Sequence, residues 1–183
     1  MLEVNFNPFP VLTTERLVLR KAKLEDAPEI LFFRSDPEML KYIDREPATS
    51  IDQAKDWLQL VIDNSDNNIG ISWNIILKGD DTTIGNIALW RLIKEHYRAE
   101  IGYVLHPKYW HNGIMDEAMK AVIDYAFNAM GLHSIEANTN PENKASQNTL
   151  MRNGFVQEAY FRENYYHDGK FTDSAIFSLV KTI

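Results

Sequence analysis

The chain has no cysteine among its 183 residues. This absence excludes a disulfide bond, a thiolate nucleophile and a cysteine-ligated zinc site. The five histidines show no metal-ligand spacing, so the sequence predicts a protein without a bound metal. A Gly-x-Ser-x-Gly elbow and a Walker-type phosphate loop are also missing, which excludes the usual serine-hydrolase and P-loop enzyme classes.

Long apolar runs are absent as well. No stretch approaches the roughly 20 apolar residues that span a bilayer, and the first ten residues, MLEVNFNPFP, hold no basic segment followed by an apolar one. We therefore expect no membrane anchor, no secretory signal and a cytoplasmic location. The formal net charge of -7 argues against a direct nucleic-acid partner and favours a cationic or amine partner.

The sequence contains no linker-like run, internal repeat or low-complexity tract. Its hydrophobic content of 45% is typical of a globular protein, and its length is that of one ordinary domain. We therefore expect residues 1–183 to form a single domain.

The pattern of apolar residues predicts the order of the helices and strands. Strands are expected at 16–21, 70–77, 83–92, 99–105, 133–137, 156–166 and 170–180. One helix is expected to begin with residues 24–31, and three others are expected to span 50–62, 113–130 and 143–152. The three consecutive strands before residue 106 resemble an antiparallel meander, and Asp168-Gly169 predicts a hairpin turn. This order indicates an α+β fold with one central mixed sheet.

Gly113 stands between an aromatic stretch and the start of a predicted helix. A glycine there frees backbone N–H groups to face an anion, because the first N–H groups of a helix have no partner within it. Gly113 also fits an ordinary helix cap, and its position alone leaves both interpretations open.

Several segments, in this order, resemble the GNAT superfamily of N-acetyltransferases, and within it the branch that acetylates protein N-termini such as those of ribosomal proteins. They are TERLVLR at 14–20, AEIGYVL at 99–105, WHNGIM at 110–115, and NKAS at 143–146 followed by NGF at 153–155. The resemblance covers nearly the whole chain. It implies the GNAT fold, a mostly antiparallel sheet flanked by helices with splayed central strands, and acetyl-CoA as co-substrate.

The resemblance also implies how acetyl-CoA is bound. Backbone N–H groups of the loop at 111–116 would bind its pyrophosphate, the strand at 103–105 would pair with its pantetheine arm, and Asn143 would hold the pantetheine or an ordered water. The residues implied in cofactor binding are Tyr103, Val104, Leu105, Trp110, His111, Asn112, Gly113, Ile114, Met115, Asp116, Asn143 and Ser146.

Four positions depart from the pattern of the superfamily. Met115 stands where a small residue is usual, His111 and Asn112 where glycine and a basic or amide residue are usual, and Leu150 where many members have a tyrosine acid. A long side chain at Met115 is compatible with anion binding by backbone groups if it turns into the core. The two acids after Met115 suit a helix N-terminus but repel a phosphate if they face it.

Acetyl transfer to an amine needs a neutral nitrogen and a proton for the departing thiolate. Glu100 is the expected proton acceptor, directly or through water; alternatively it is a strand carboxylate facing solvent or Arg98. Ser146 is the expected proton donor to sulfur, because the resemblance places it beside the cofactor. Alternatively, Asn143 and Ser146 start and cap a helix.

The expected function is acetyl transfer from acetyl-CoA to a primary amine, foremost the α-amine of a protein N-terminus. An α-amine is roughly 10 to 20% neutral at pH 7, so it demands little from a base. The alternatives are an acetyltransferase for a small amine, such as a polyamine, amino sugar or amino acid, and a domain that binds acyl-CoA without catalysis. The sequence leaves the oligomeric state open.

Overall fold

The computed structural model describes residues 1–182, and their strands form one eight-stranded sheet in the order β1-β2-β3-β4-β5-β6-β8-β7. The strands are β1 (Leu12–Thr13), β2 (Leu17–Lys21), β3 (Ile71–Leu77), β4 (Gly85–Ile93), β5 (Arg98–Leu105), β6 (Ser134–Thr139), β7 (Val156–His167) and β8 (Lys170–Val180). Within residues 1–182 only β5 and β6 pair in parallel. The predicted α+β fold with a mixed, mostly antiparallel sheet is therefore confirmed.

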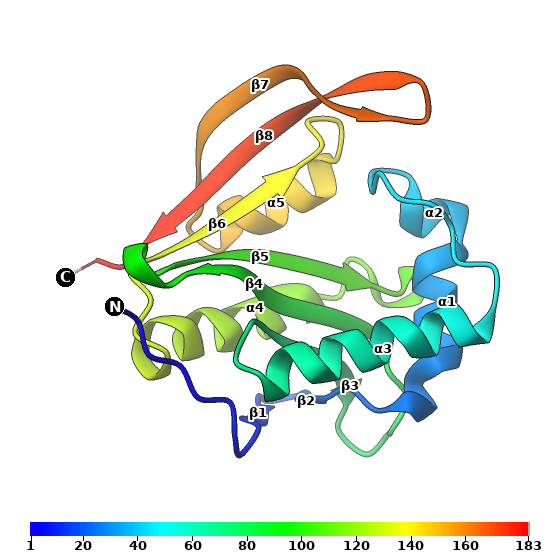
Figure 1. Ribbon diagram of the computed structural model, residues 1–183, viewed down its shortest axis with the longest axis vertical. Coiled ribbons are helices and arrows are strands. Elements are labelled where there is room, and N and C mark those ends of the chain that lie inside the picture. The colour runs from blue at the N-terminus through cyan, green and yellow to red at the C-terminus, as the bar shows by residue number, and fades with distance from the viewer. Residues whose placement is uncertain (183) are drawn as a thin grey trace.

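Helices cover both faces of this sheet (Figure 1). They are α1 (Ala27–Ser35), α2 (Pro37–Leu40), α3 (Ile51–Asp66), α4 (Ile114–Asp124) and α5 (Lys144–Arg152), with a π-helical turn at Tyr125–Ala129 and short 3-10 turns at Leu24–Asp26, Lys94–His96 and Pro107–Tyr109. Side chains of α4 share the main core with the sheet, while α1 and α3 form a second core on the opposite face. On β5, Leu105 belongs to the first core and Val104 packs against the second.

Most predicted elements are present, and the differences have local causes. The helix expected at 113–130 changes to π-helical geometry after Asp124, before Gly131 ends it with a φ of +77°. The sequence pattern missed α2, which is too short to show a period: Asp36 caps it by accepting from the backbone N–H of Glu38 and Met39, and Pro37 opens it. The two-residue strand β1 was missed for the same reason.

The hairpin predicted at Asp168-Gly169 is confirmed. Both residues have a positive φ, 45° and 75°, and His167 pairs with Lys170 across the turn. Such a turn suits the twist of a two-residue hairpin.

Strands β5 and β6 pair over three positions only, ending at Glu100 opposite Glu136. Beyond these positions the two strands diverge, and α5 lies beside the gap between them (Figure 1). The expected splay of the central strands is thus confirmed. It leaves one edge of β5 without a neighbouring strand over the segment 101–105.

Candidate functional site

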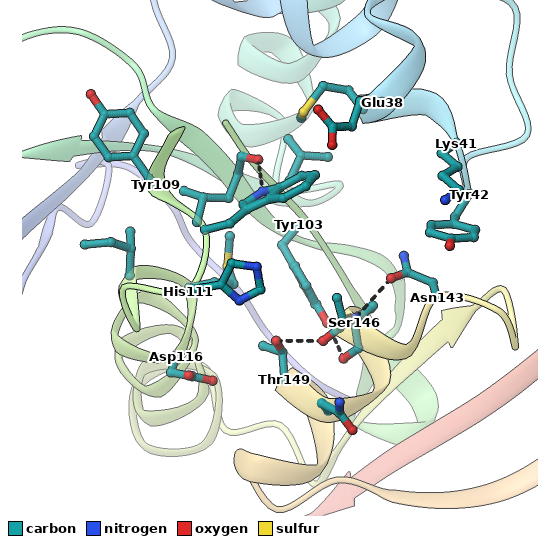
Figure 2. A pocket seen from close by; sticks show the side chains of 18 of the residues that line it. Glu38, Lys41, Tyr42, Tyr103, Tyr109, His111, Asp116, Asn143, Ser146 and Thr149 are labelled. Carbon is teal, nitrogen blue, oxygen red and sulfur yellow. Dashed lines mark hydrogen bonds between the residues drawn. The ribbon is translucent and has the colours of Figure 1, made fainter. Parts of the chain in front are cut away.

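A cavity of about 500 Å³ lies where β5 and β6 diverge. All the residues expected to bind the cofactor line it except Asn112. Figure 2 shows Glu38, Lys41 and Tyr42 on the side of α2, with Ser146 and Thr149 on the side of α5. The structure therefore brings the predicted loop, strand and helix residues to one cavity.

The N-terminus of α4 opens onto this cavity at Gly113, whose φ of +70° is in the left-handed region. The helical hydrogen bonds begin at Glu117, whose N–H donates to the Gly113 carbonyl over 3.1 Å. The preceding carbonyl, of Asn112, accepts from Arg16 Nη1 at 2.9 Å. Because the C=O and N–H of one trans peptide point in opposite directions, this contact directs the Gly113 N–H away from Arg16.

The two acids in the first turn of α4 are both paired with arginines. Asp116 accepts from Asn153 and forms an ion pair with Arg152 at 3.0 Å. Glu117 accepts from Arg16 Nε at 2.6 Å and from the Thr14 hydroxyl. Burial acts to raise the pKa of Glu117, but these hydrogen bonds outweigh it and lower the pKa. Neither acid therefore presents an unbalanced charge to an anion at the helix N-terminus.

Two of the departures from the family pattern are explained by burial. Met115 is 8% exposed and turns into the main core, as anion binding by the backbone requires. Leu150 is 1% exposed and lies in the same core, so α5 has no hydroxyl at that position. A proton donor on α5 must come from another residue.

A pair of hydroxyl groups connects β5 to α5. Tyr103 Oη lies 2.8 Å from Ser146 Oγ and also donates to the Ser146 carbonyl. Burial raises the pKa of Tyr103 to about 12, although the Ser146 hydroxyl acts in the opposite direction. Asn143 accepts from the Ser146 N–H at 3.0 Å and so caps α5. The capping alternative thus holds for Asn143, while the Ser146 hydroxyl faces Tyr103.

Alternation along β5 decides which backbone groups face the gap. The His106 N–H donates to the Ile84 carbonyl, and Val104 is paired with Asn86 in the same register. The N–H and C=O of Val104 therefore turn toward β4, whereas those of Tyr103 and Leu105 turn toward the gap. The Leu105 carbonyl accepts from the Trp110 indole N–H at 2.7 Å. Val104 contributes its side chain to the cavity, not its backbone.

Glu100 lies outside the cavity, two residues before Gly102 on the face of β5 that carries Val104. It is 8% exposed and bonds Arg91 Nη1 at 2.9 Å. Burial raises the pKa of Glu100, and Arg91 partly opposes this shift. Glu100 does not face solvent: it is buried against Arg91, while the nearby Arg98 forms its ion pair with Glu136.

Sequence analysis missed several residues that line the cavity. From α2 and the residues after it come Glu38, Lys41 and Tyr42, and the last turn of α5 contributes Arg152. The signal for α5 was present: the cavity-lining residues Ala145, Asn148, Thr149 and Arg152 recur at the spacing of one helix face. No comparable signal marks α2.

Within residues 1–182 no group of three or more histidine or acidic side chains is placed to hold a metal ion. Over the same range, none of the helices has the length and apolarity needed to cross a membrane.

Comparison with known proteins gives a consistent result. The family model described as acetyltransferase (GNAT) domain matches residues 16–156. The uncharacterized N-acetyltransferase p20 of Bacillus licheniformis is 39% identical over 170 residues, which cover 93% of this chain and 96% of that protein.

Solved structures share the fold. The ribosomal-protein-S5-alanine acetyltransferase of Vibrio fischeri has a TM-score of 0.80 at 25% identity, covering 93% of this chain and 96% of that one. The ribosomal L7/L12 alpha-N-protein acetyltransferase RimL, in complex with coenzyme A, has a TM-score of 0.85 at 19% identity, covering 93% and 98%.

Proposed function

Because this chain belongs to the GNAT family of acetyltransferases, we propose that it transfers the acetyl group of acetyl-CoA to the N-terminal α-amine of a protein. Family membership makes the chain an acyltransferase. The proposal adds the acceptor and the residues that act on it. Ribosomal-protein acetyltransferases among the structures of the same fold support this choice of acceptor.

The cavity fits acetyl-CoA in charge and in hydrogen-bonding groups. The free N–H groups of the first turn of α4 and the nearby Arg152 suit a pyrophosphate. The backbone of Tyr103, turned toward the gap, suits the amide groups of a pantetheine arm, which would take the place of a strand. Asn112 supports the loop through its carbonyl rather than its side chain.

Arg152 supplies a cation that the loop itself lacks. Replacing it with glutamine removes this charge and leaves Asp116 without its arginine at the helix N-terminus. We expect the Kd for acetyl-CoA to rise about tenfold, measured by isothermal titration calorimetry. Adding Asp116→Asn to the variant is expected to restore part of the affinity. An unchanged Kd in the single variant contradicts a role for Arg152 in binding.

The chemistry is divided between two side chains. Glu100 accepts a proton from the acceptor amine, directly or through water, as the nitrogen forms its bond to the acetyl carbon. Ser146 donates its hydroxyl proton to the sulfur as the carbon–sulfur bond breaks, and the Tyr103 hydroxyl, 2.8 Å away, turns its single proton from the Ser146 carbonyl to Ser146 Oγ in this step. The high pKa of Tyr103 keeps this second donor protonated.

The state of Glu100 is the observation that favours an α-amine. Its carboxylate lies outside the lining of the cavity, which suits assistance to an amine that is already partly neutral. A lysine amine is below about 0.1% neutral at pH 7 and needs a stronger base. The arrangement therefore fits a protein N-terminus better than a lysine side chain.

Release of free CoA tests the proposal. We expect turnover with peptides that have a free N-terminal serine or alanine, and none with the same peptides blocked at the N-terminus but carrying an internal lysine. Spermidine and free amino acids are assayed alongside as acceptors, to test the alternative of a small-amine substrate. Faster turnover with any of these than with the free peptides overturns the choice of a protein acceptor.

Binding without catalysis remains the second candidate, because Leu150 removes the usual acid of α5. A thermal-shift titration separates the two. Acetyl-CoA is expected to raise the unfolding midpoint in a saturable way, since it binds only the native state. A saturable shift without CoA release from any amine supports the binding domain instead.

A further inference from the structure

Strand β4 carries an irregularity at Arg91, next to the residues that face β5. Arg91 has a φ of +47°, and the register with β5 shifts between Trp90 and Ile93. A positive φ is strained for an arginine, and such strain persists where the surrounding structure fixes it. A bulge of this kind redirects a side chain that regular alternation sends to the other face.

The redirected Arg91 side chain packs over the ring of the preceding residue, Trp90. The Arg91 guanidinium lies 4.3 Å from the centroid of the Trp90 ring, and its Nη1 bonds Glu100 Oε2 at 2.9 Å. Trp90 and Glu100 are cross-strand partners, so all three side chains share one face of the sheet. The Arg91 side chain is 63% exposed, whereas that of Glu100 is 10% exposed. The arginine therefore covers an aromatic face and a carboxylate from the solvent side.

Trp90 also reaches toward the cavity. A Cβ added to Gly102 would lie 3.5 Å from Trp90 Nε1, so the indole lies along this glycine. Val104, the next residue on the same face, lines the cavity. If the pyrophosphate lies at α4 and the pantetheine runs from Leu105 toward Tyr103, the acetyl end lies near Gly102. The Trp90 indole then adjoins the place where the acceptor nitrogen must arrive.

We propose that the face of Trp90 and the carboxylate of Glu100 form the subsite for the protonated amine of the acceptor, and that the Arg91 guanidinium fills this subsite until an acceptor displaces it. An ammonium ion is recognised by the same two groups, a carboxylate and an aromatic face, that hold the guanidinium. This assignment rests on the proposed function, because it takes an amine as the acceptor.

Arg91 is the cation that forms an ion pair with Glu100, and the other charged groups nearby are paired with each other. Glu136 on β6 stands opposite Glu100 and bonds Arg98 of β5 at 3.3 Å. Because Arg98 is engaged by Glu136, displacement of Arg91 leaves the Glu100 carboxylate open to a new cation. The exposed position of Arg91 permits this displacement without disturbing the core.

Arg91→Asn tests the displacement, because asparagine tolerates a positive φ and carries no charge. The probe is tetramethylammonium, a cation that cannot be acetylated, and the readout is the NMR signal of the Trp90 indole N–H, identified by its loss in Trp90→Phe. We expect the probe to bind the variant about five- to tenfold more tightly than the wild-type chain, since an internal competitor has been removed. Lys120→Ala, which removes one exposed positive charge on α4, is the control and is expected to leave the affinity at the wild-type value.

This titration does not depend on turnover, so its result is separate from that of the CoA-release assay. Equal affinity of both proteins for the probe, or no change at the Trp90 signal, overturns the subsite even if wild-type turnover is normal. With an active enzyme, Arg91→Asn is also expected to lower the KM for the peptide amine about five- to tenfold at unchanged KM for acetyl-CoA. A raised amine KM in the variant shows instead that Arg91 itself contacts the acceptor and overturns the displacement.

Discussion

Replacing Gly113 by proline is expected to weaken acetyl-CoA binding by at least about a hundredfold while the protein stays folded. Gly113 has a φ of +70°, and proline fixes φ near −65°, so the peptide held by Arg16 must rotate. Proline also removes the Gly113 N–H. The loss of two charge-assisted hydrogen bonds, about 1.5 to 3 kcal/mol each, accounts for the factor. Calorimetry gives the Kd, and circular dichroism confirms the fold.

A matched pair of alanine variants separates this effect from general strain. Gly113 and Gly131, near the two ends of the same helical segment, have φ values of +70° and +77°. An added Cβ meets only Arg16 Nη2 at 3.6 Å in the first case and Leu2 Cδ1 at 3.9 Å in the second. Both variants therefore lose about 1 to 2 kcal/mol of stability through φ alone. Only Gly113→Ala is expected to lose acetyl-CoA affinity; an equal loss in Gly131→Ala contradicts the assignment of the loop.

The sequence was a good guide to elements with a clear period or a diagnostic turn. The meander, helix α3 and the hairpin at Asp168-Gly169 are all found where they were predicted. In each case local residues determine the structure: Ser50 accepts from the Gln53 N–H, and the hairpin residues adopt positive φ. Elements of two to four residues, such as α2, have no period to detect.

The candidate site was predictable only where a single segment determines it. Gly113 and Ser146 belong to local motifs, and both reach the cavity. The pairing of Asp116 with Arg152 joins residues 36 positions apart, and Arg16 meets the loop from the distant bend before β2, so neither contact has a local signature. The contact between Arg91 and Glu100 could not be predicted from the sequence either. Regular alternation along β4 directs Arg91 to the opposite face, and only the bulge brings it to Glu100.

Ser146→Ala is expected to lower kcat about a hundredfold, within the range for loss of a general acid, while the KM for acetyl-CoA changes less than about twofold. The Asn143 cap on the Ser146 N–H does not need the hydroxyl, so α5 keeps its start. Ser65→Ala is the matched control, because its hydroxyl bonds a carbonyl within α3 and lies away from the cavity. Full activity of Ser146→Ala leaves the Ser146 hydroxyl with a structural role only, as the partner of the Tyr103 hydroxyl.

Tyr103→Phe then shows whether the two hydroxyls act as one unit. If Tyr103 donates to Ser146 Oγ while Ser146 donates to sulfur, the single variant loses activity and the double variant is no slower than Ser146→Ala alone. Because the pKa of Tyr103 is about 12, the pair stays protonated, and kcat is expected to show no alkaline loss from this residue below about pH 11. Independent, multiplicative losses contradict a relay and leave Tyr103 as a support that holds β5 against α5.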